Sequence, residues 1–83
     1  MLLKIKKIMR GPGPGETLVE VLTSSGAIEE VIVDRSAIER EMIDVGNPIH
    51  RENDRVLVEL PREAMSGRWR VWVPRRSLRE ARR

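Results

Sequence analysis

Near its C-terminal end the chain carries a cluster of residues whose types and spacing suit the binding of a polyanion. A guanidinium group binds phosphate oxygens through paired hydrogen bonds, and an indole ring stacks on a nucleobase. Residues two apart in a strand project from the same face, so Arg70 and Trp72 are expected to present both groups together. The predicted binding site, for a protein or a nucleic acid, comprises Arg68, Arg70, Trp72, Arg75, Arg76 and Arg79.

Both tryptophans also have a purely structural interpretation. The chain contains no Phe or Tyr, so Trp69 and Trp72 are the only large rings available to fill a core. The alternation predicts that Trp69 faces inward with Val71 and Val73, whereas Trp72 takes the opposite face. Acidic side chains on that opposite face are expected to repel phosphates unless arginines neutralise them, and these are Glu20, Glu30 and Glu59.

The sequence contains few of the residues that metal binding, nucleotide binding or catalysis requires. His50 is the one histidine and there is no cysteine, so a zinc site of those ligands cannot form within a single chain. The acidic residues follow no calcium-loop spacing, and the glycines of residues 11–15 match neither a dinucleotide fingerprint nor a phosphate loop. A Ser-His-Asp group requires an arbitrary choice among five serines. We therefore expect no catalysis, metal, cofactor or small-molecule substrate.

The length of the chain limits the number of domains, and the distribution of charge limits the kinds of partner. A chain of 83 residues forms one domain, because it buries only about 60% of the surface that its unfolded form exposes. The net charge of +3 is unevenly distributed: residues 1–10 carry +4, residues 11–61 carry −7 and residues 62–83 carry +6. If the two basic ends meet in the fold, they form a patch for a polyanion. Equally, they suit self-association with the acidic middle of a neighbouring copy.

The N-terminal apolar run is interrupted by lysines, which excludes the core of a signal peptide. No run of about 18 apolar residues exists for a membrane span. We expect a soluble, cytoplasmic protein with no membrane partner.

Alternating apolar and polar residues predict five short strands, over residues 1–10, 17–22, 27–33, 55–60 and 68–73. Residues 11–15 (Gly-Pro-Gly-Pro-Gly) predict a flexible loop, and residues 79–83 a basic tail. Ser36 and Glu39 have the spacing of a capping box, so one helical turn is predicted over residues 36–43. The expected fold class is all-β, a small curled antiparallel sheet in one domain spanning residues 1–83.

The stretch from Arg68 into Pro74-Arg-Arg-Ser-Leu78 resembles the end of an SH3-like barrel, where a strand, a one-turn helix near a proline and a short last strand follow in order. Residues 71–80 (VWVPRRSLRE) are similar to the basic end of the SH3-like DNA-binding domains of integrases. The resemblance implies a five-stranded SH3-like barrel, and it concerns shape more than activity. The helical turn predicted over residues 36–43 departs from the usual loop pattern of such barrels.

Apolar strand residues exceed what one sheet face can cover. Leu57 and Trp72 share the outward face of their hairpin, and the same excess occurs in the earlier strands at Leu18, Leu22, Ile28 and Ile32. A sheet with two apolar faces needs a partner to cover the second. The preferred hypothesis is therefore a non-catalytic protein-interaction or assembly module, acting as a homo-oligomer or accessory subunit. The alternative is a small β-barrel that binds nucleic acid through its Arg/Trp-rich C-terminal strand.

Overall fold

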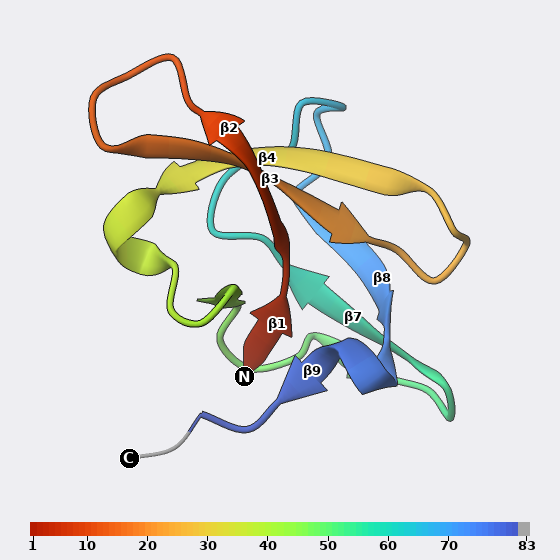
Figure 1. The fold of residues 1–83 in the computed structure, drawn as a ribbon. Helices are drawn as coiled ribbons and strands as arrows, with labels where there is room; N and C mark the ends of the chain where they lie inside the picture. The colour runs from red at the N-terminus through yellow and green to blue at the C-terminus, as the bar shows by residue number, and fades with distance from the viewer. Residues whose placement is uncertain (82–83) are drawn as a thin grey trace.

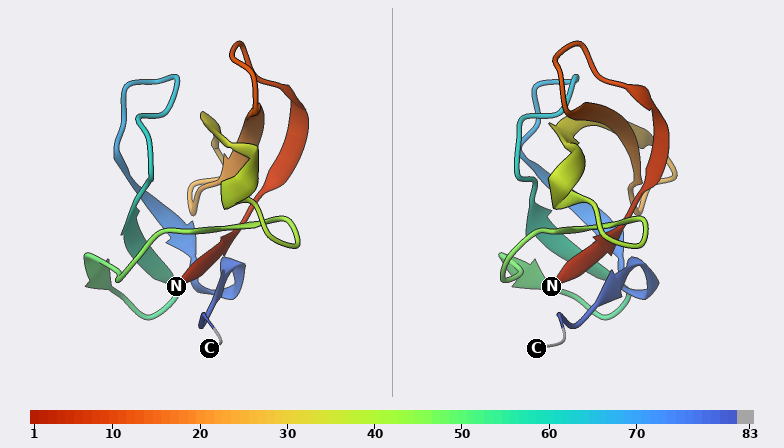
Figure 2. Two further views of the ribbon diagram at one scale, coloured as in Figure 1. Left: turned by 90° about the vertical axis from the view of Figure 1, so that its left-hand side faces the viewer. Right: turned by 60° about the vertical axis from the view of Figure 1, so that its left-hand side comes forward.

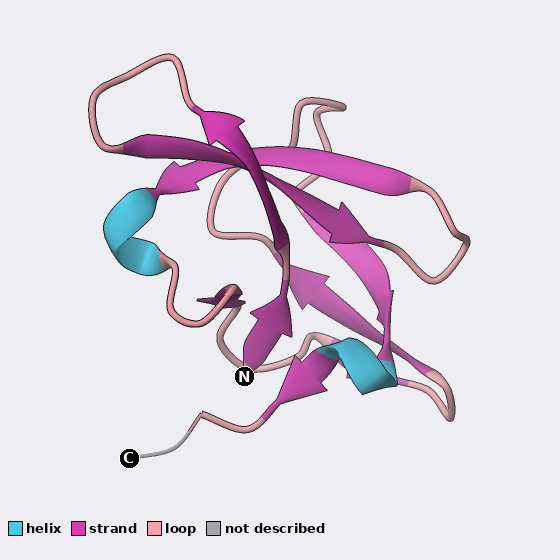
Figure 3. Cartoon of the chain, viewed as in Figure 1, coloured by secondary structure: helices cyan, strands magenta, loops and turns pink. Residues whose placement is uncertain are grey.

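The computed structural model describes residues 1–81 and shows an all-β chain, as predicted (Figures 1 and 3). The ladders of these residues form three antiparallel sheets with strand orders β5-β1-β9, β2-β3-β4 and β6-β7-β8, and not one closed five-stranded barrel. In chain order the elements are β1 (Leu2–Lys4), β2 (Lys6–Arg10), β3 (Glu16–Leu22), β4 (Ile28–Asp34), the 3-10 turn η1 (Arg35–Ala37), β5 (Met42–Asp44), β6 (His50–Arg51), β7 (Arg55–Glu59), β8 (Arg70–Pro74), the 3-10 turn η2 (Arg75–Ser77) and β9 (Leu78–Arg79).

The core lies between the sheets and consists mainly of valine. Figure 2 shows β2 and β3 on one side of the molecule, β7 and β8 on the other, and β1 and β9 at the end that joins them. Branched aliphatic side chains at every second strand position suit this pleated interior. The side chains with no or almost no exposed surface are Leu3, Val19, Val21, Val31, Val33, Ile43, Val56, Val58 and Val73.

Single backbone hydrogen bonds tie the sheets together at their edges. Ser24 N–H donates to the carbonyl of Trp72 at 2.9 Å and joins the β3–β4 turn to β8. Met65 N–H donates to the carbonyl of Glu30 at 2.7 Å and holds the loop before β8 against β4. Within the described residues, no helix is long and apolar enough to cross a membrane.

The two central hairpins and the C-terminal order are confirmed. β3 pairs with β4 along its whole length, and β7 pairs in the same way with β8. β8 ends at Pro74, η2 forms one 3-10 turn, and β9 follows directly. Residues 11–15 connect β2 to β3, and Gly11 N–H donates to the carbonyl of Glu16 at 2.8 Å. Arg79, the first residue of the predicted tail, belongs to β9, whereas Arg82 and Arg83 lie outside the described residues.

The helical turn predicted over residues 36–43 is wrong in its extent and capping. The 3-10 turn covers only Arg35–Ala37, and its N-cap residue is Asp34, which makes no side-chain capping hydrogen bond. Glu39 and Met42 instead exchange backbone hydrogen bonds, each 3.0 Å long, as an isolated β-bridge. The pairing of β5 with β1 requires an extended chain from Met42 onward. Tertiary pairing therefore overrides the local helical signal.

The inward orientation predicted for Trp69 is also wrong, because its side chain is 50% exposed. Trp69 precedes β8, although its carbonyl still accepts a hydrogen bond of 2.7 Å from Leu60 N–H. Leu60 and Ala64, in contrast, are buried members of the core. The indole ring of Trp69 is therefore not part of the core.

The turn before β5 allows a stabilising substitution. Arg40 and Glu41 both have positive φ, 52° and 60°, the conformation of a type I′ hairpin turn, which favours glycine at its second position. We expect Glu41→Gly to raise the free energy of unfolding by about 0.5–1 kcal/mol. Urea unfolding measures it. The reverse change Gly26→Ala, at φ 91° with no atom within 4 Å of the added Cβ, should be destabilising. Loss of stability in Glu41→Gly would contradict a left-handed turn.

Candidate functional site

The structure divides the six predicted site residues between separate surfaces. Arg68, Arg70 and Trp72 line a hollow of about 300 Å³ between β8 and the β3–β4 turn. The remaining three lie on η2 and β9, where the chain turns back toward β1. A single surface combining the tryptophan with all five arginines is therefore not formed.

Trp72 is half-buried on the outward face of β8, and its ring already has neighbours. The guanidinium carbon of Arg55 lies 4.0 Å from the ring centroid, in a cation–π arrangement. The His50 ring meets the indole edge-on, with centroids 6.0 Å apart. Leu57 lies directly opposite on β7. Because Arg55 covers one face of the indole, less of the ring is open for stacking on a base.

Carboxylates accompany the arginines around this hollow. Arg70 Nε lies 3.1 Å from Glu59, and Arg68 Nη1 lies 3.3 Å from Glu29. Glu29 is only 5% exposed, and Ser66 Oγ donates a hydrogen bond of 2.6 Å to its other oxygen. These ion pairs offset the positive charge near Trp72 and weaken the attraction for a phosphate backbone.

Arg55 also has an acidic partner, Glu52, in the turn between β6 and β7. Its Nε donates to Glu52 at 2.7 Å, and this hydrogen bond lowers the pKa of the Glu52 carboxyl. All three arginines that line the hollow therefore pair with a carboxylate.

Arg75 is engaged by the backbone of the β6–β7 turn. Its guanidinium donates to the carbonyls of Asn53 at 3.1 Å and Glu52 at 2.6 Å, and its own N–H donates to the carbonyl of Asp54 at 3.1 Å. These three hydrogen bonds satisfy carbonyls that the tight turn leaves without strand partners. The geometry indicates a structural role for Arg75.

Arg62 joins two further acids at the opposite end of β3. It donates to Glu16 at 2.6 Å and lies 3.4 Å from Asp34. The hydrogen bond lowers the pKa of Glu16 and raises the pKa of Arg62. Because folding lowers the pKa of Glu16, the hydrogen bond with Arg62 stabilises the folded state above the usual pKa of 4.5. This contribution to the free energy of unfolding is lost as the pH falls below that value and Glu16 becomes protonated.

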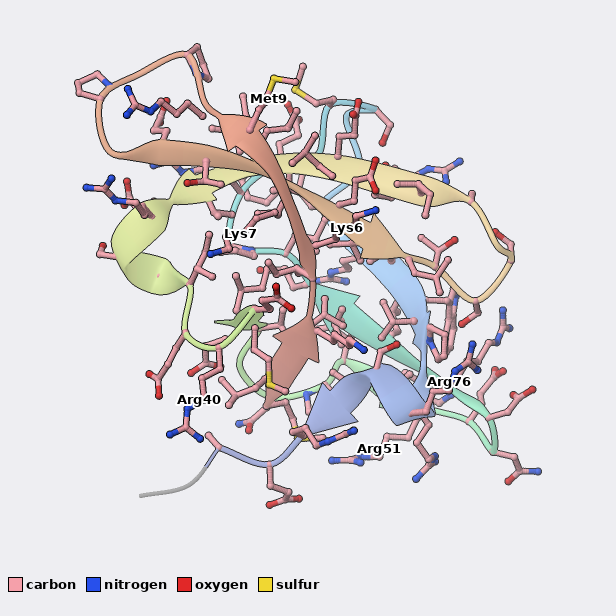
Figure 4. The ribbon with its side chains drawn as sticks, viewed as in Figure 1. Lys6, Lys7, Met9, Arg40, Arg51 and Arg76 are labelled. Atoms are coloured by element: carbon pink, nitrogen blue, oxygen red, sulfur yellow. The ribbon has the colours of Figure 1, made fainter. Side chains whose placement is uncertain are left out.

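A second surface gathers cations from both ends of the chain. β9 pairs with β1, with Arg79 opposite Leu2, so η2 comes to lie beside the β1–β2 junction. A groove of about 620 Å³ lies between this junction, the end of β3 and η2. In Figure 4, Lys6 and Arg76 lie on the same side of β1. We call this surface the basic groove. Its lining includes four cations, one acid and two aliphatic residues of β3 and β4: Lys4, Lys6, Arg76, Arg79, Glu20, Leu22 and Ile28.

The basic groove combines an excess of positive charge with exposed aliphatic surface. Its four cations face one acid, Glu20, and within residues 1–81 none of the four makes a salt bridge. Arg79 donates only to backbone carbonyls, those of Arg76 and Leu78. Leu22 and Ile28 are opposite each other on β3 and β4, and are 41% and 49% exposed. The arrangement suits a ligand that is both anionic and apolar.

Sequence reasoning identified only part of this groove. Arg76 and Arg79 were among the predicted site residues, but Lys4 and Lys6 were not. The available signal was the charge profile, which showed two basic ends and raised the possibility that they meet. Only the pairing of β1 with β9 brings them together.

No group of three or more His, Asp or Glu in the described part of the chain is placed to hold a metal ion. Of the predicted site residues, Arg68, Arg70 and Trp72 line the Trp72 hollow, and Arg76 and Arg79 line the basic groove. No protein-family model, curated protein or solved structure matches the chain.

Proposed function

We propose that the protein is a non-catalytic protein-interaction module, which binds an acidic, aliphatic segment of a partner protein in the basic groove. The supporting observation is the convergence of four cations, from both ends of the chain, around two exposed aliphatic side chains. Partner carboxylates pair with the cations, and a partner aliphatic side chain covers Leu22 and Ile28. Charge complementarity of this kind fixes the choice and register of a partner, while apolar burial supplies affinity.

The aliphatic floor of the groove favours a protein ligand over a nucleic acid. Proteins that bind single strands place aromatic rings beside their cations, because every base has a face on which to stack. In this chain Trp72 lies in the other hollow, with Arg55 over its ring. The unpaired cations and the ring therefore belong to different surfaces, which weakens the nucleic-acid alternative.

Fluorescence anisotropy of a labelled peptide with alternating Glu and Leu tests the proposal. Reversing two groove charges, Lys6→Glu with Arg76→Glu, should weaken binding about tenfold or more, since each reversal replaces an attraction by a repulsion. The matched control is Lys7→Glu with Arg10→Glu, which makes the same charge change on β2 outside the groove. The control should retain affinity within about threefold.

Three outcomes contradict the proposal. Absence of peptide binding excludes the groove as a site for this chemistry. Equal losses in the two double variants indicate unspecific attraction to the net charge. Displacement of the peptide by an oligonucleotide at low concentration, with a steep salt dependence, favours the nucleic-acid alternative.

The partner segment comes from another protein or from the acidic middle of a second copy, and sedimentation velocity distinguishes the two.

We also propose that the three sheets are related to a five-stranded SH3-like barrel. The order of β8, η2 and β9 supports this relationship. The cytoplasmic location stays a prediction, which imaging of a fluorescently tagged chain tests.

A further inference from the structure

The outward face of the β2-β3-β4 sheet carries three rows of side chains that run across its strands. Residues opposite each other in a ladder lie on the same face, and the buried pair Val19–Val31 marks the inward face. The outward rows are an aliphatic one (Met9, Leu18 and Ile32), a charged one (Lys6, Glu20 and Glu30) and a second aliphatic one (Leu22 and Ile28). The charged row therefore lies between two aliphatic rows.

The aliphatic rows of this face are exposed at both ends. Met9 is 61% exposed, and Leu22 and Ile28 are also exposed. All five residues of β2 are exposed, and β2 lies on the outside of the molecule (Figure 2). Exposed aliphatic side chains that gather on one face, with charges among them, are typical of a surface that a partner covers.

Two outward charges of opposite sign stand side by side on this face without pairing. Lys6 on β2 is directly opposite Glu20 on β3. Within residues 1–81, neither side chain takes part in a salt bridge. Each of them is thus available to a charge of opposite sign on another molecule.

The order of these two charges decides how a second copy packs on the face. A two-fold axis parallel to the strands, between β2 and β3, places Lys6 of each copy over Glu20 of the other. The same axis places Met9 of each copy over Leu18 of the other, so aliphatic groups cover aliphatic groups. A two-fold axis across the strands places Lys6 over Lys6 and Glu20 over Glu20, which is repulsive. Of these two orientations, only the first is attractive.

We propose that the protein forms a two-fold symmetric dimer through this face, in which β3 of each copy is the acidic, aliphatic segment that the other copy binds. This inference rests on the proposed function and names its partner, because Leu18, Glu20 and Leu22 alternate along the outward side of β3. Leu22 of the second copy then lies over the β1–β2 junction, at one side of the basic groove. Few short strands meet, so the interface is small and we expect a dissociation constant of about 10–100 μM.

Sedimentation velocity over a concentration range of about 5–500 μM tests the dimer. Lys6→Glu and Glu20→Lys, each alone, should weaken self-association about tenfold or more, because each places like charges over each other at both contacts. An equimolar mixture of the two variants should associate as tightly as the unaltered protein, since the mixed pair has opposite charges at both contacts. Association of the mixture also requires both variants to be folded, so a loss in either one alone is not due to unfolding.

Glu30→Lys is the matched control for Glu20→Lys. It makes the same charge change in the same row, one strand further from the axis, and Glu30 does not line the basic groove. Self-association of this variant should stay within about threefold of that of the unaltered protein.

The outcomes separate the dimer from the proposed function. A protein that stays monomeric to about 500 μM, or a mixture that associates no better than either variant alone, overturns the dimer. If that protein still binds the Glu and Leu peptide and responds to Lys6→Glu with Arg76→Glu, the proposed function stands. Charge rescue in a protein that does not bind the peptide supports the dimer and overturns capture of a separate acidic segment.

Discussion

Leu3→Ala should lower the free energy of unfolding by about 3 kcal/mol, the largest effect expected of a single substitution in this chain. Leu3 has no exposed surface and lies at the centre of the β5-β1-β9 sheet. It is opposite Ile43 on one side and Leu78 on the other, and both are buried. Truncation leaves a cavity among strands that are held in register by hydrogen bonds, so the neighbours cannot collapse into it. Since small domains are stable by about 5–15 kcal/mol, the loss is a large share.

Urea unfolding followed by tryptophan fluorescence measures this loss. Leu22→Ala is the matched control, because it removes the same atoms from a side chain that is 41% exposed. The control should cost about 1 kcal/mol or less. Equal costs for the two variants would mean that β1 contributes no more to the core than the rim of the groove does.

Ser66→Ala should lower the free energy of unfolding by about 1–3 kcal/mol, because it leaves one oxygen of a buried carboxylate without a partner. That carboxylate belongs to Glu29, which points inward from β4 in line with Val31. The Ser66 hydroxyl donates to it at 2.6 Å, while its second partner, Arg68, lies at 3.3 Å and has a side chain that is 70% exposed. The exposed arginine cannot replace the lost hydrogen bond.

A double-mutant cycle assigns this cost to the pair. In a Glu29→Met background, Ser66→Ala should change the stability by about 0.5 kcal/mol or less, since no buried charge remains to be satisfied. Ser36→Ala, at an exposed serine, controls for the substitution itself. If Ser66→Ala costs the same in both backgrounds, the hydroxyl acts through the loop, where it also accepts from Arg68 N–H at 3.4 Å, and the contact with Glu29 is not its source.

The period-two pattern of the chain was sufficient to predict the main strands. Val19, Val21, Val31 and Val33 occupy every second position of β3 and β4, and all four are buried. The same pattern predicted β7 and β8, and the order of strand, turn and strand from β8 to β9. These features were predictable because alternation depends only on near neighbours along the chain. It also correctly predicted an outward apolar set at Leu22 and Ile28.

Local pattern failed where a distant strand decided the conformation. Ser36 and Glu39 have capping-box spacing, yet the pairing of β5 with β1 extends the chain and leaves only one 3-10 turn. Trp69 fits the inward alternation, yet β8 begins only at Arg70 and Trp69 is 50% exposed. For the helical turn, the competing interaction joins residues 42–44 to residues 2–4, which are far apart in sequence, so no short window of the chain contains it.

By itself, the sequence determined an all-β chain, its principal hairpins, and two basic ends on either side of an acidic middle. The tertiary structure alone decided which charges are neutralised and which remain available. It placed Glu29 and Glu59 beside the arginines near Trp72, and it brought the N-terminal lysines next to η2 through the ladder of β1 and β9. The physical reason is that charges interact through space, whereas the spacing of residues along a strand reveals only which face each side chain takes.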